Sequence, residues 1–480
     1  MIKKQIEPHI FIILGATGNL ARRKLFPALY QLSTKGALQG KSVILGVSRN
    51  KECNDTTFRD QIKNILETTG LSINDNAFSE WCEKCLHYHS IGEGNLEDYR
   101  KLSDRILELE TQKNLSGNRV FYMALPPDAF PPTIKGLGES ELNKGSSWTR
   151  IVIEKPFGHD LESAKGLNNL VHRYFQESQI YRIDHFLGKE TVQNLLVFRF
   201  ANAFFEHLWN REHIESIDIV VAENQGIEGR ANYYEQSGAL RDMVENHLTQ
   251  LLTLVAMEPP TTFESDAIRN EKIKILRQIA PIRSEDVVFG QYTEGMINGK
   301  KVRGYREELG VSPESKTETF VGLRLEIANW RWAGVPFFLF TGKRMPQRLT
   351  QIKVRFQCAP VSIFAPFGPA CSVQPNVLII TIQPDEGFDL KIQVKSLGQP
   401  MNLTTQSLNF KYSDTFGLPP DAYEALLLDV INGDQTLFVH SDEVESAWSL
   451  YTPLLKIDKL IRLYPAGSGY PPETDRLYMR

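Results

Sequence analysis

The sequence has 480 residues, of which 41% are hydrophobic and 23% are charged, and its formal net charge is −4. A chain of this length exceeds what one compact core usually accommodates, so two domains are expected. The ordinary composition argues against intrinsic disorder, and the slight acidic excess argues against a nucleic-acid-binding protein. Any anion site must therefore be built from a few local basic residues.

Targeting and membrane signals are not apparent in the sequence. The first residues, MIKKQIEP, lack the apolar core and cleavage site of a signal peptide. No uninterrupted apolar run approaches the roughly 20 residues that a membrane helix needs. The five cysteines are scattered along the chain, which is unlike a disulfide framework and typical of a reducing compartment. We therefore expect a cytoplasmic protein with no membrane or nucleic-acid partner.

The first 180 residues alternate between short apolar runs and amphipathic stretches. Helical spacing is seen near 20–32 and 58–65, and the apolar runs are 10–14, 43–47, 120–125 and 151–153. Such β-α-β alternation predicts a mostly parallel, doubly wound sheet. We expect a Rossmann-like α/β domain over residues 1–180.

The pattern changes after about residue 180. Helical stretches near 190–200 and 238–257 precede strand-like segments at 318–327, 337–340, 352–356, 377–382 and 388–394, and two helices near 422–431 and 441–460 follow. Strands grouped after helices are typical of an α+β domain. Residues 181–480 are expected to form such a domain, with a large, mainly antiparallel sheet.

A glycine turn follows the first predicted strand. Gly15-Ala16-Thr17-Gly18 leads directly into a helix. Glycines let a backbone approach a pyrophosphate, and a helix N-terminus offers free N–H groups and partial positive charge. The spacing is G-x-x-G rather than G-x-G-x-x-G, so a simple tight turn remains the alternative to a dinucleotide site.

The second predicted strand ends in Gly46-Val47-Ser48-Arg49-Asn50. Folds that bind NAD usually carry an acidic residue here for the ribose 2′-hydroxyl. Arg49 stands there instead, and a guanidinium both stacks on adenine and pairs with a 2′-phosphate. The turn favours NADP and leaves room for NAD, because nothing in it repels that cofactor. A solvated surface arginine is the alternative.

Two further segments carry groups suited to catalysis. Lys155 ends a strand in the sequence VIEKPFG, where it can reach both a nicotinamide and a substrate. The segment YRIDHFLGKE then offers Asp184, His185 and Lys189 ahead of a helix, which suits binding of a phosphate group. An exposed lysine in the first segment and a charged, helix-capping loop in the second are the alternatives.

One histidine lies on an apolar helical line. Leu240, Val244, His247, Leu251 and Val255 recur at spacings of four and three. A lone histidine on such a face is more often a core residue than a catalytic one.

A possible metal motif is also present. Cys82 and Cys85 form C-x-x-C, with His87 and His89 just beyond. The histidines are spaced for a strand rather than for the usual H-x₃₋₅-H ligand pair, and no second C-x-x-C exists. We interpret the segment as a helix end followed by a strand, and expect no metal.

Taken together, these motifs resemble those of the glucose-6-phosphate dehydrogenase family. The matching segments occur in the family's order between about residue 10 and residue 350, and they are GATGNLARRK, EKPFG, RIDHFLGKE, IEGR with RDMVENHLTQ, and NWRWAGVPFFLFTGK. The resemblance implies oxidation of glucose 6-phosphate to its lactone with hydride transfer to NADP. It also implies a homodimer or homotetramer.

The resemblance implies roles for individual residues. It makes His247 the general base and Asp184 the carboxylate that orients it. The implied substrate-binding residues are Lys155, His185, Lys189, Glu223, Asp242, Lys343 and Arg348. The implied cofactor-binding residues are Gly15, Thr17, Gly18, Leu20, Lys24, Arg49, Tyr122 and Lys155. Phe186 and Asn19 depart from the family pattern, which usually has a tyrosine and an aspartate at these positions.

Overall fold

The computed structural model describes residues 6–38, 40–69, 75–145, 147–364, 372–398, 401–417 and 421–479. These residues form two compact units. The first comprises the described residues of Met1–Lys189, Thr262–Arg269 and Pro420–Val444, and the second comprises those of Glu190–Thr261, Asn270–Pro419 and Glu445–Arg480.

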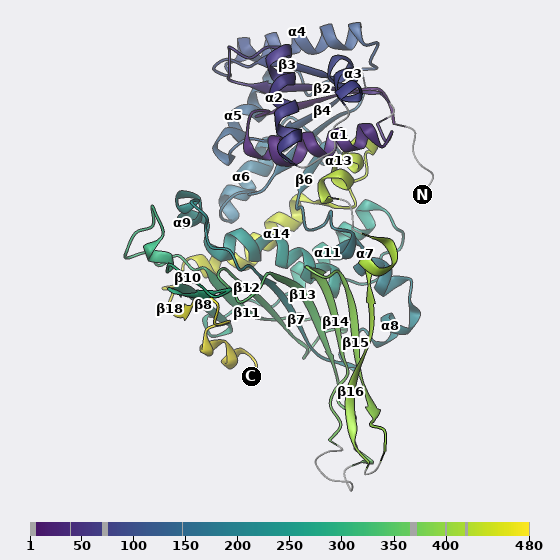
Figure 1. Cartoon of the computed structure of the whole chain (residues 1–480), viewed down its shortest axis with the longest axis vertical. Helices are drawn as coiled ribbons and strands as arrows, with labels where there is room; N and C mark the ends of the chain where they lie inside the picture. Colours follow the sequence, from purple (N-terminus) through teal and green to yellow (C-terminus); the bar gives the residue numbers. More distant parts are fainter. Residues whose placement is uncertain are drawn as a thin grey trace. The chain divides into compact units, whose positions relative to one another are not determined.

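A seven-stranded sheet forms the centre of the first unit (Figure 1). Its order is β17-β6-β5-β4-β1-β2-β3, and all neighbours are parallel except β17 and β6. The strands are β1 His9–Leu14, β2 Ser42–Ser48, β3 Leu86–Ser90, β4 Asn118–Met123, β5 Thr149–Glu154, β6 Ile180–Ile183 and β17 Phe438–Val439. The predicted Rossmann-like, doubly wound sheet is therefore confirmed.

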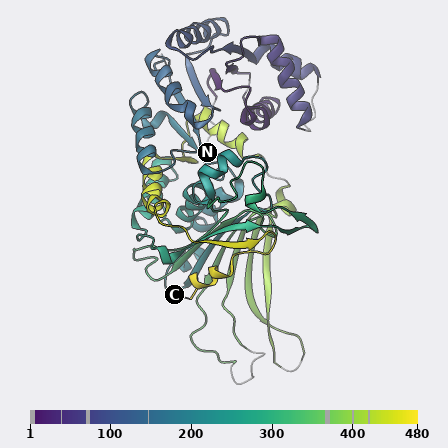
Figure 2. The same ribbon diagram turned by 90° about the vertical axis from the view of Figure 1, so that its left-hand side faces the viewer.

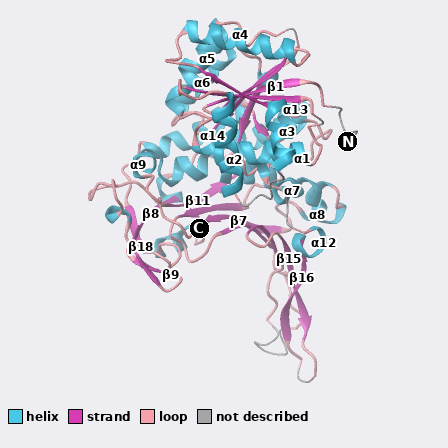
Figure 3. Ribbon diagram, turned by 45° about the horizontal axis from the view of Figure 1, so that its top comes forward, coloured by secondary structure: helices cyan, strands magenta, loops and turns pink. Residues whose placement is uncertain are grey.

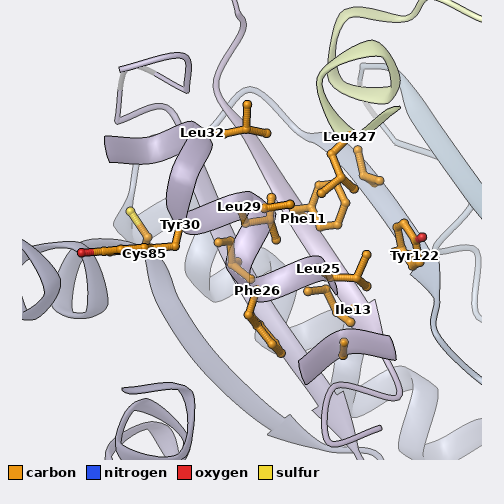
Figure 4. Close-up of a cluster of buried hydrophobic side chains, with 14 of the residues drawn as sticks. Phe11, Ile13, Leu25, Phe26, Leu29, Tyr30, Leu32, Cys85, Tyr122 and Leu427 are labelled. Atoms are coloured by element: carbon orange, nitrogen blue, oxygen red, sulfur yellow. The ribbon is translucent and has the colours of Figure 1, made fainter. Parts of the chain in front are cut away.

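Helices cover both faces of this sheet, which explains why its strands are apolar on both sides. One face packs against α1, α2, α3 and α13 through side chains such as Phe11, Leu29 and Leu427 (Figure 4). The alternate residues Ile10 and Ile12 are equally buried, and α4, α5 and α6 gather on the other side (Figure 3). The helices are α1 Phe26–Thr34, α2 Asp55–Thr68, α3 Asp75–Cys85, α4 Leu96–Gln112, α5 Phe130–Glu139, α6 Leu161–His172 and α13 Ala422–Asn432.

Late parts of the chain complete the first unit. Helix α13 packs on α1, and Arg150 of β5 donates hydrogen bonds to the carbonyl oxygens of Val430 and Ile431 at 2.7 and 2.6 Å. These carbonyls lie in the last turn of α13, where the regular intrahelical donors run out, and the Gly433 N–H reaches the Val430 carbonyl only at 3.3 Å. The end of α13 is thus held by a side chain of the central sheet.

A cluster of charges around Glu177 joins three segments of the first unit. The Glu177 carboxylate accepts hydrogen bonds from Arg182 at 2.7 Å, Arg269 at 3.3 Å and the Ser441 backbone N–H at 3.0 Å, and it contacts His172 Nε2 at 2.7 Å. Burial by itself would raise the pKa of Glu177, but Arg182 and these hydrogen bonds lower it to about 2. Folding therefore favours the ionised form of the Glu177 side chain.

We expect this carboxylate to contribute to stability only when it is ionised. A depressed pKa stabilises the fold above about pH 4.5, and this contribution is lost as the pH falls toward about 2. Glu177→Gln should lose roughly 2–3 kcal/mol at pH 7 and show a flatter acid dependence. Melting temperatures between pH 7 and pH 3 measure this. Glu139→Gln, which breaks an exposed pair with Lys135, is the control. Parallel curves for wild type and Glu177→Gln would contradict the assignment.

The second unit is built on a nine-stranded sheet, whose long strands β14–β16 lie side by side (Figure 2, light green). Its order is β16-β15-β14-β13-β7-β12-β11-β8-β18, with antiparallel neighbours except β7–β12 and β8–β18. The strands are β7 Ile214–Ala222, β8 Val287–Thr293, β11 Phe320–Glu326, β12 Pro336–Gly342, β13 Leu349–Phe356, β14 Val377–Gln383, β15 Gly387–Lys395, β16 Leu403–Lys411 and β18 Ile461–Pro465. The predicted large, mainly antiparallel sheet is confirmed.

One long helical stretch packs on the middle of this sheet. It contains a π-helical segment η4 (Leu240–Leu248) followed by α10 (Thr249–Ala256), and η4 contacts β7, β11 and β12. The indole N–H groups of Trp209 and Trp332 bond to the last carbonyls of α10, at Val255 and Ala256. The remaining α-helices and short strands are α7 Glu190–Phe200, α8 Ala203–Leu208, α9 Ala231–Ala239, α11 Ser265–Gln278, α12 Tyr412–Phe416, α14 Ser441–Leu455, β9 Gly295–Ile297 and β10 Lys300–Val302. Of these, α11 and α14 begin in segments of the first unit and end in segments of the second.

Among the described residues, none of the helices has both the length and the apolar character needed to cross a bilayer.

Candidate active site

The predicted glycine turn joins β1 to the first helix of the sheet. Gly15 has φ +91°, and a Cβ at this position would lie 2.3 Å from the carbonyl oxygen of Ala124. The N–H groups of Gly15 and Ala16 donate to the Val47 carbonyl at 2.8 and 3.1 Å. Glycine is therefore required here by the close packing of neighbouring strand ends, and the absence of a side chain also keeps the turn open.

A cavity of about 730 Å³ lies over this turn, at the carboxyl ends of β1, β2 and β4. Gly15, Thr17, Gly18 and Arg49 all line it. Arg49 is exposed. The cavity therefore fits a dinucleotide with phosphates near the helix N-terminus and a 2′-phosphate near Arg49. Glu93, which sequence reasoning missed, also lines the cavity and lies 3.7 Å from Lys51.

The other four predicted cofactor residues, Leu20, Lys24, Tyr122 and Lys155, are not among those lining this cavity. Leu20 packs partly buried against the apolar core. Lys24 forms an ion pair with Asp421 at 2.7 Å. Tyr122 is fully buried, and its hydroxyl donates to the Glu154 carboxylate. Contact of these four residues with the cofactor remains a prediction.

The motif RIDHFLGK follows β6 directly. Asp184 Oδ1 accepts the N–H of Phe186 at 2.9 Å, and the Asp184 carbonyl accepts the N–H of Leu187 at 3.0 Å. The side-chain nitrogen of Lys189 lies 3.8 Å from the centre of the Phe186 ring, a cation–π contact. Phe186, which departs from the family pattern, thus supports the lysine even without a hydroxyl. Lys155 lies after β5, the neighbouring parallel strand.

In the second unit, the structure brings together three of the predicted substrate residues. Glu223 follows β7 and Lys343 follows β12, and these strands are parallel neighbours, so both residues lie at the same edge of the sheet. Lys343 Nζ donates to Glu223 and lies 3.9 Å from Asp242 Oδ2. The Tyr233 hydroxyl, which sequence reasoning missed, donates to Asp242 Oδ1 at 3.2 Å. Two carboxylates and one ammonium group are well suited to binding sugar hydroxyls.

The backbone of Lys343 is held on both sides. Its N–H donates to the Thr319 carbonyl at 2.9 Å, and its carbonyl accepts the Tyr464 hydroxyl at 2.8 Å. Tyr464 is fully buried and comes from β18, far away in the sequence. No local sequence signal points to this contact.

His247 lies in η4, and its backbone N–H donates a hydrogen bond to Asn246 Oδ1 at 2.7 Å. The five residues that were predicted to share one face of an α-helix, from Leu240 to Val255, are all buried. Residues 240–248, however, are π-helical and not α-helical. Short π-helical segments are rare and often occur at functional sites.

Arg348 is exposed beside the start of β13, where its side chain donates a hydrogen bond to Gln383 of β14 at 3.3 Å. Gln383 was also missed by sequence reasoning.

The C-x-x-C segment has the predicted helix–strand structure. Helix α3 ends at Cys85 and β3 begins at Leu86. Burial raises the pKa of the Cys82 thiol to about 12, which disfavours the thiolate that a metal requires. His87 Nδ1 lies 3.0 Å from the Asp55 carboxylate. These contacts favour a structural role.

Comparisons with known proteins agree along the whole chain. Residues 12–194 match the family model for the glucose-6-phosphate dehydrogenase NAD binding domain, and residues 196–480 match the model for the C-terminal domain. Glucose-6-phosphate 1-dehydrogenase of Aggregatibacter actinomycetemcomitans is 44% identical, over 98% of this chain and 96% of that protein. The enzyme of Bacillus subtilis is 41% identical, over 100% and 98%.

Solved structures give the same result. A glucose-6-phosphate dehydrogenase in complex with its substrate glucose-6-phosphate superposes with a TM-score of 0.91 and 35% identity, covering 99% of this chain and 98% of that one. The glucose-6-phosphate 1-dehydrogenase of Mycobacterium avium gives a TM-score of 0.84 and 34% identity, covering 98% and 97%. With both halves matched by family models and with relatives above 40% identity along its length, this chain belongs to the glucose-6-phosphate dehydrogenase family.

Proposed function

We propose that this protein oxidises glucose 6-phosphate to the 6-phosphoglucono-lactone and passes the hydride to NADP. The observation that carries the proposal is the placement of Lys343 between Glu223 and Asp242 at one sheet edge, in a chain of this family. Such a group binds the hydroxyls of a sugar. The cavity at the glycine turn supports a dinucleotide.

The chemistry requires one base and one hydride acceptor. We assign His247 as the base that takes the proton from the anomeric hydroxyl, and Asp184 as the carboxylate that orients the imidazole. NADP, when bound, supplies the hydride acceptor. His185 and Lys189 hold the phosphate, so that binding energy far from C1 positions the reacting carbon. Lys155 contacts both substrate and cofactor, and Arg348 adds a basic group at the substrate.

A spectrophotometric assay at 340 nm with glucose 6-phosphate and each dinucleotide tests the function directly. Rapid reduction of NADP with glucose 6-phosphate, and much slower reduction with galactose 6-phosphate or free glucose, is expected. Faster oxidation of another phosphorylated aldose would identify a different sugar substrate. No reduction with any aldose would favour a non-catalytic, NADP-binding regulator.

Cofactor choice should depend on Arg49. An arginine pairs with the 2′-phosphate of NADP, whereas its stacking on adenine helps both cofactors. Arg49→Ala should raise the KM for NADP by roughly 10- to 100-fold and affect NAD much less, from the value of about 1.5–3 kcal/mol for a charge-assisted hydrogen bond. The NADP penalty should shrink at high salt, because an exposed ion pair is screened.

Measurements of KM for both cofactors at two salt concentrations decide this point. Arg100→Ala, which removes an exposed arginine of α4, is the matched control. Equal losses for NADP and NAD would mean that Arg49 only stacks on adenine, and that another residue binds the 2′-phosphate.

A homodimer or homotetramer in the cytoplasm completes the proposal. The oligomer is expected from the family resemblance, and mass measurement by light scattering tests it. The cysteines described in the structure, at positions 53, 82, 85 and 358, form no disulfide, which suits a reducing compartment.

A further inference from the structure

A glutamate in the first unit connects two residues that were expected to bind ligands. Glu154 is the last residue of β5 and directly precedes Lys155. Its Oε1 atom accepts hydrogen bonds from the Tyr122 hydroxyl at 2.5 Å and from the Tyr423 hydroxyl at 3.2 Å. Tyr122 belongs to β4 and Tyr423 to α13, so this one oxygen joins three elements. The EKP motif gives no reason to expect such a contact.

The connection extends to the helix that follows the glycine turn. Asp421 caps α13 by accepting the Tyr423 N–H at 2.9 Å, and it also pairs with Lys24 at 2.7 Å. Lys24 Nζ lies 5.9 Å from the centre of the Tyr423 ring. The Lys24–Asp421 pair is about half exposed and contributes little by itself. The tyrosine–glutamate contacts are better protected from water, because Tyr122 and Tyr423 are both buried.

The charge of Glu154 is sensitive to pH near neutrality. Burial raises its pKa to about 7, the two tyrosine hydroxyls and Lys155 oppose the rise, and Asp184 adds to it. The pKa values of Tyr122 and Tyr423 are both raised, so their hydroxyls remain donors. An ionised carboxylate accepts from both hydroxyls. A protonated one carries a donor of its own and competes with them.

We propose that Glu154 is a positioning residue, whose ionised carboxylate is held by Tyr122 and Tyr423 and fixes the strand end that presents Lys155. This inference rests on the proposed dehydrogenase function, because it is through Lys155 that Glu154 affects catalysis. Glu154 does not contact the reacting atoms in this role. Helix α13, from the far end of the chain, thereby becomes part of the support of the active site.

A mutant cycle tests the coupling. Glu154→Gln should lower kcat/KM for glucose 6-phosphate by about 10-fold, and Tyr423→Phe by about 3- to 10-fold, in the range of a hydrogen bond to a charged group. The double variant should be no worse than Glu154→Gln within about twofold, because both changes remove one interaction. Tyr30→Phe, another buried tyrosine of this unit, is the control and should retain wild-type kinetics and melting temperature.

Two outcomes would overturn the proposal. One is a double variant whose loss is the product of the two single losses, which would mean independent structural effects. The other is wild-type kcat/KM in a folded Glu154→Gln variant. The pH profile adds a separate check, because the acid limb of log(kcat/KM) should lose one ionisation near pH 7 in Glu154→Gln. An unchanged limb would also contradict the role.

A spectroscopic experiment does not depend on activity at all. Infrared difference spectra of the ligand-free protein, wild type minus Glu154→Gln, should show a protonated-carboxyl band that titrates near pH 7. A Glu154 carboxylate that stays ionised down to pH 5 would show that the charge of Glu154 does not change near neutral pH, which would contradict this part of the inference. This titration can succeed even if the 340 nm assay finds no oxidation of glucose 6-phosphate, so failure of the inference and failure of the proposed function are distinguishable.

Discussion

His247→Ala should lower kcat with glucose 6-phosphate by about 10² to 10⁴-fold, the usual contribution of a positioned general base. The KM for glucose 6-phosphate should change little, because the imidazole acts on the proton that leaves during the reaction and not on the phosphate. Steady-state kinetics at saturating NADP measures both constants. Added imidazole should restore part of the activity, since the truncated side chain leaves space for it.

The control for this experiment is His213→Ala, which removes a histidine from the loop before β7. It should leave kcat within about twofold of wild type, as for surface substitutions away from the site. Asp184→Asn should resemble His247→Ala in kcat if the two act as a pair. A folded His247→Ala variant with wild-type kcat would show that His247 is a buried structural residue of η4 and not the general base.

Lys189→Ala should lower kcat/KM for glucose 6-phosphate by about 10- to 100-fold, from the value of roughly 1.5–3 kcal/mol for a charge-assisted contact with a dianion. The reaction with free glucose should be nearly unchanged, because that sugar has no phosphate. Comparison of kcat/KM for the two sugars in wild type and variant measures the difference. The Phe186 ring, 3.8 Å from Lys189 Nζ, holds the ammonium group in place.

Phe186→Leu separates charge from support. It should weaken glucose 6-phosphate binding less than Lys189→Ala does, because the lysine keeps its charge but loses the ring. Lys144→Ala, at an exposed surface lysine, is the matched control and should have no effect. Equal losses with glucose and glucose 6-phosphate in Lys189→Ala would show that Lys189 does not bind the phosphate.

Sequence reasoning succeeded where local pattern and local chemistry coincide. The strands β1, β2, β4 and β5 are continuous apolar runs, since helices cover both faces of their sheet. The turn from Gly15 to Gly18 could be predicted from the sequence because the close approach of Gly15 to Ala124 requires a glycine. Arg49 lines the cavity because a strand end determines where its next residues lie.

Strand β6 shows why other elements were missed. It contains Arg182, and a charged residue in a short apolar run argues against a buried strand when only neighbouring residues are considered. The structure buries this arginine because Glu177 and Asn168 satisfy its guanidinium, and Glu177 also binds Arg269 from a distant segment. A residue's burial here depends on partners that only folding supplies.

By itself, the sequence determined the family, the Rossmann-like and antiparallel sheets, and the residue types that the chemistry needs. Tertiary structure alone decided which of them meet: Lys343 with Glu223 and Tyr464, and Glu154 with Tyr423. The physical reason is that propensity and periodicity act over a few residues. These contacts instead join positions separated by 120, 121 and 269 residues, and they form only when strand order and helix packing bring the segments together.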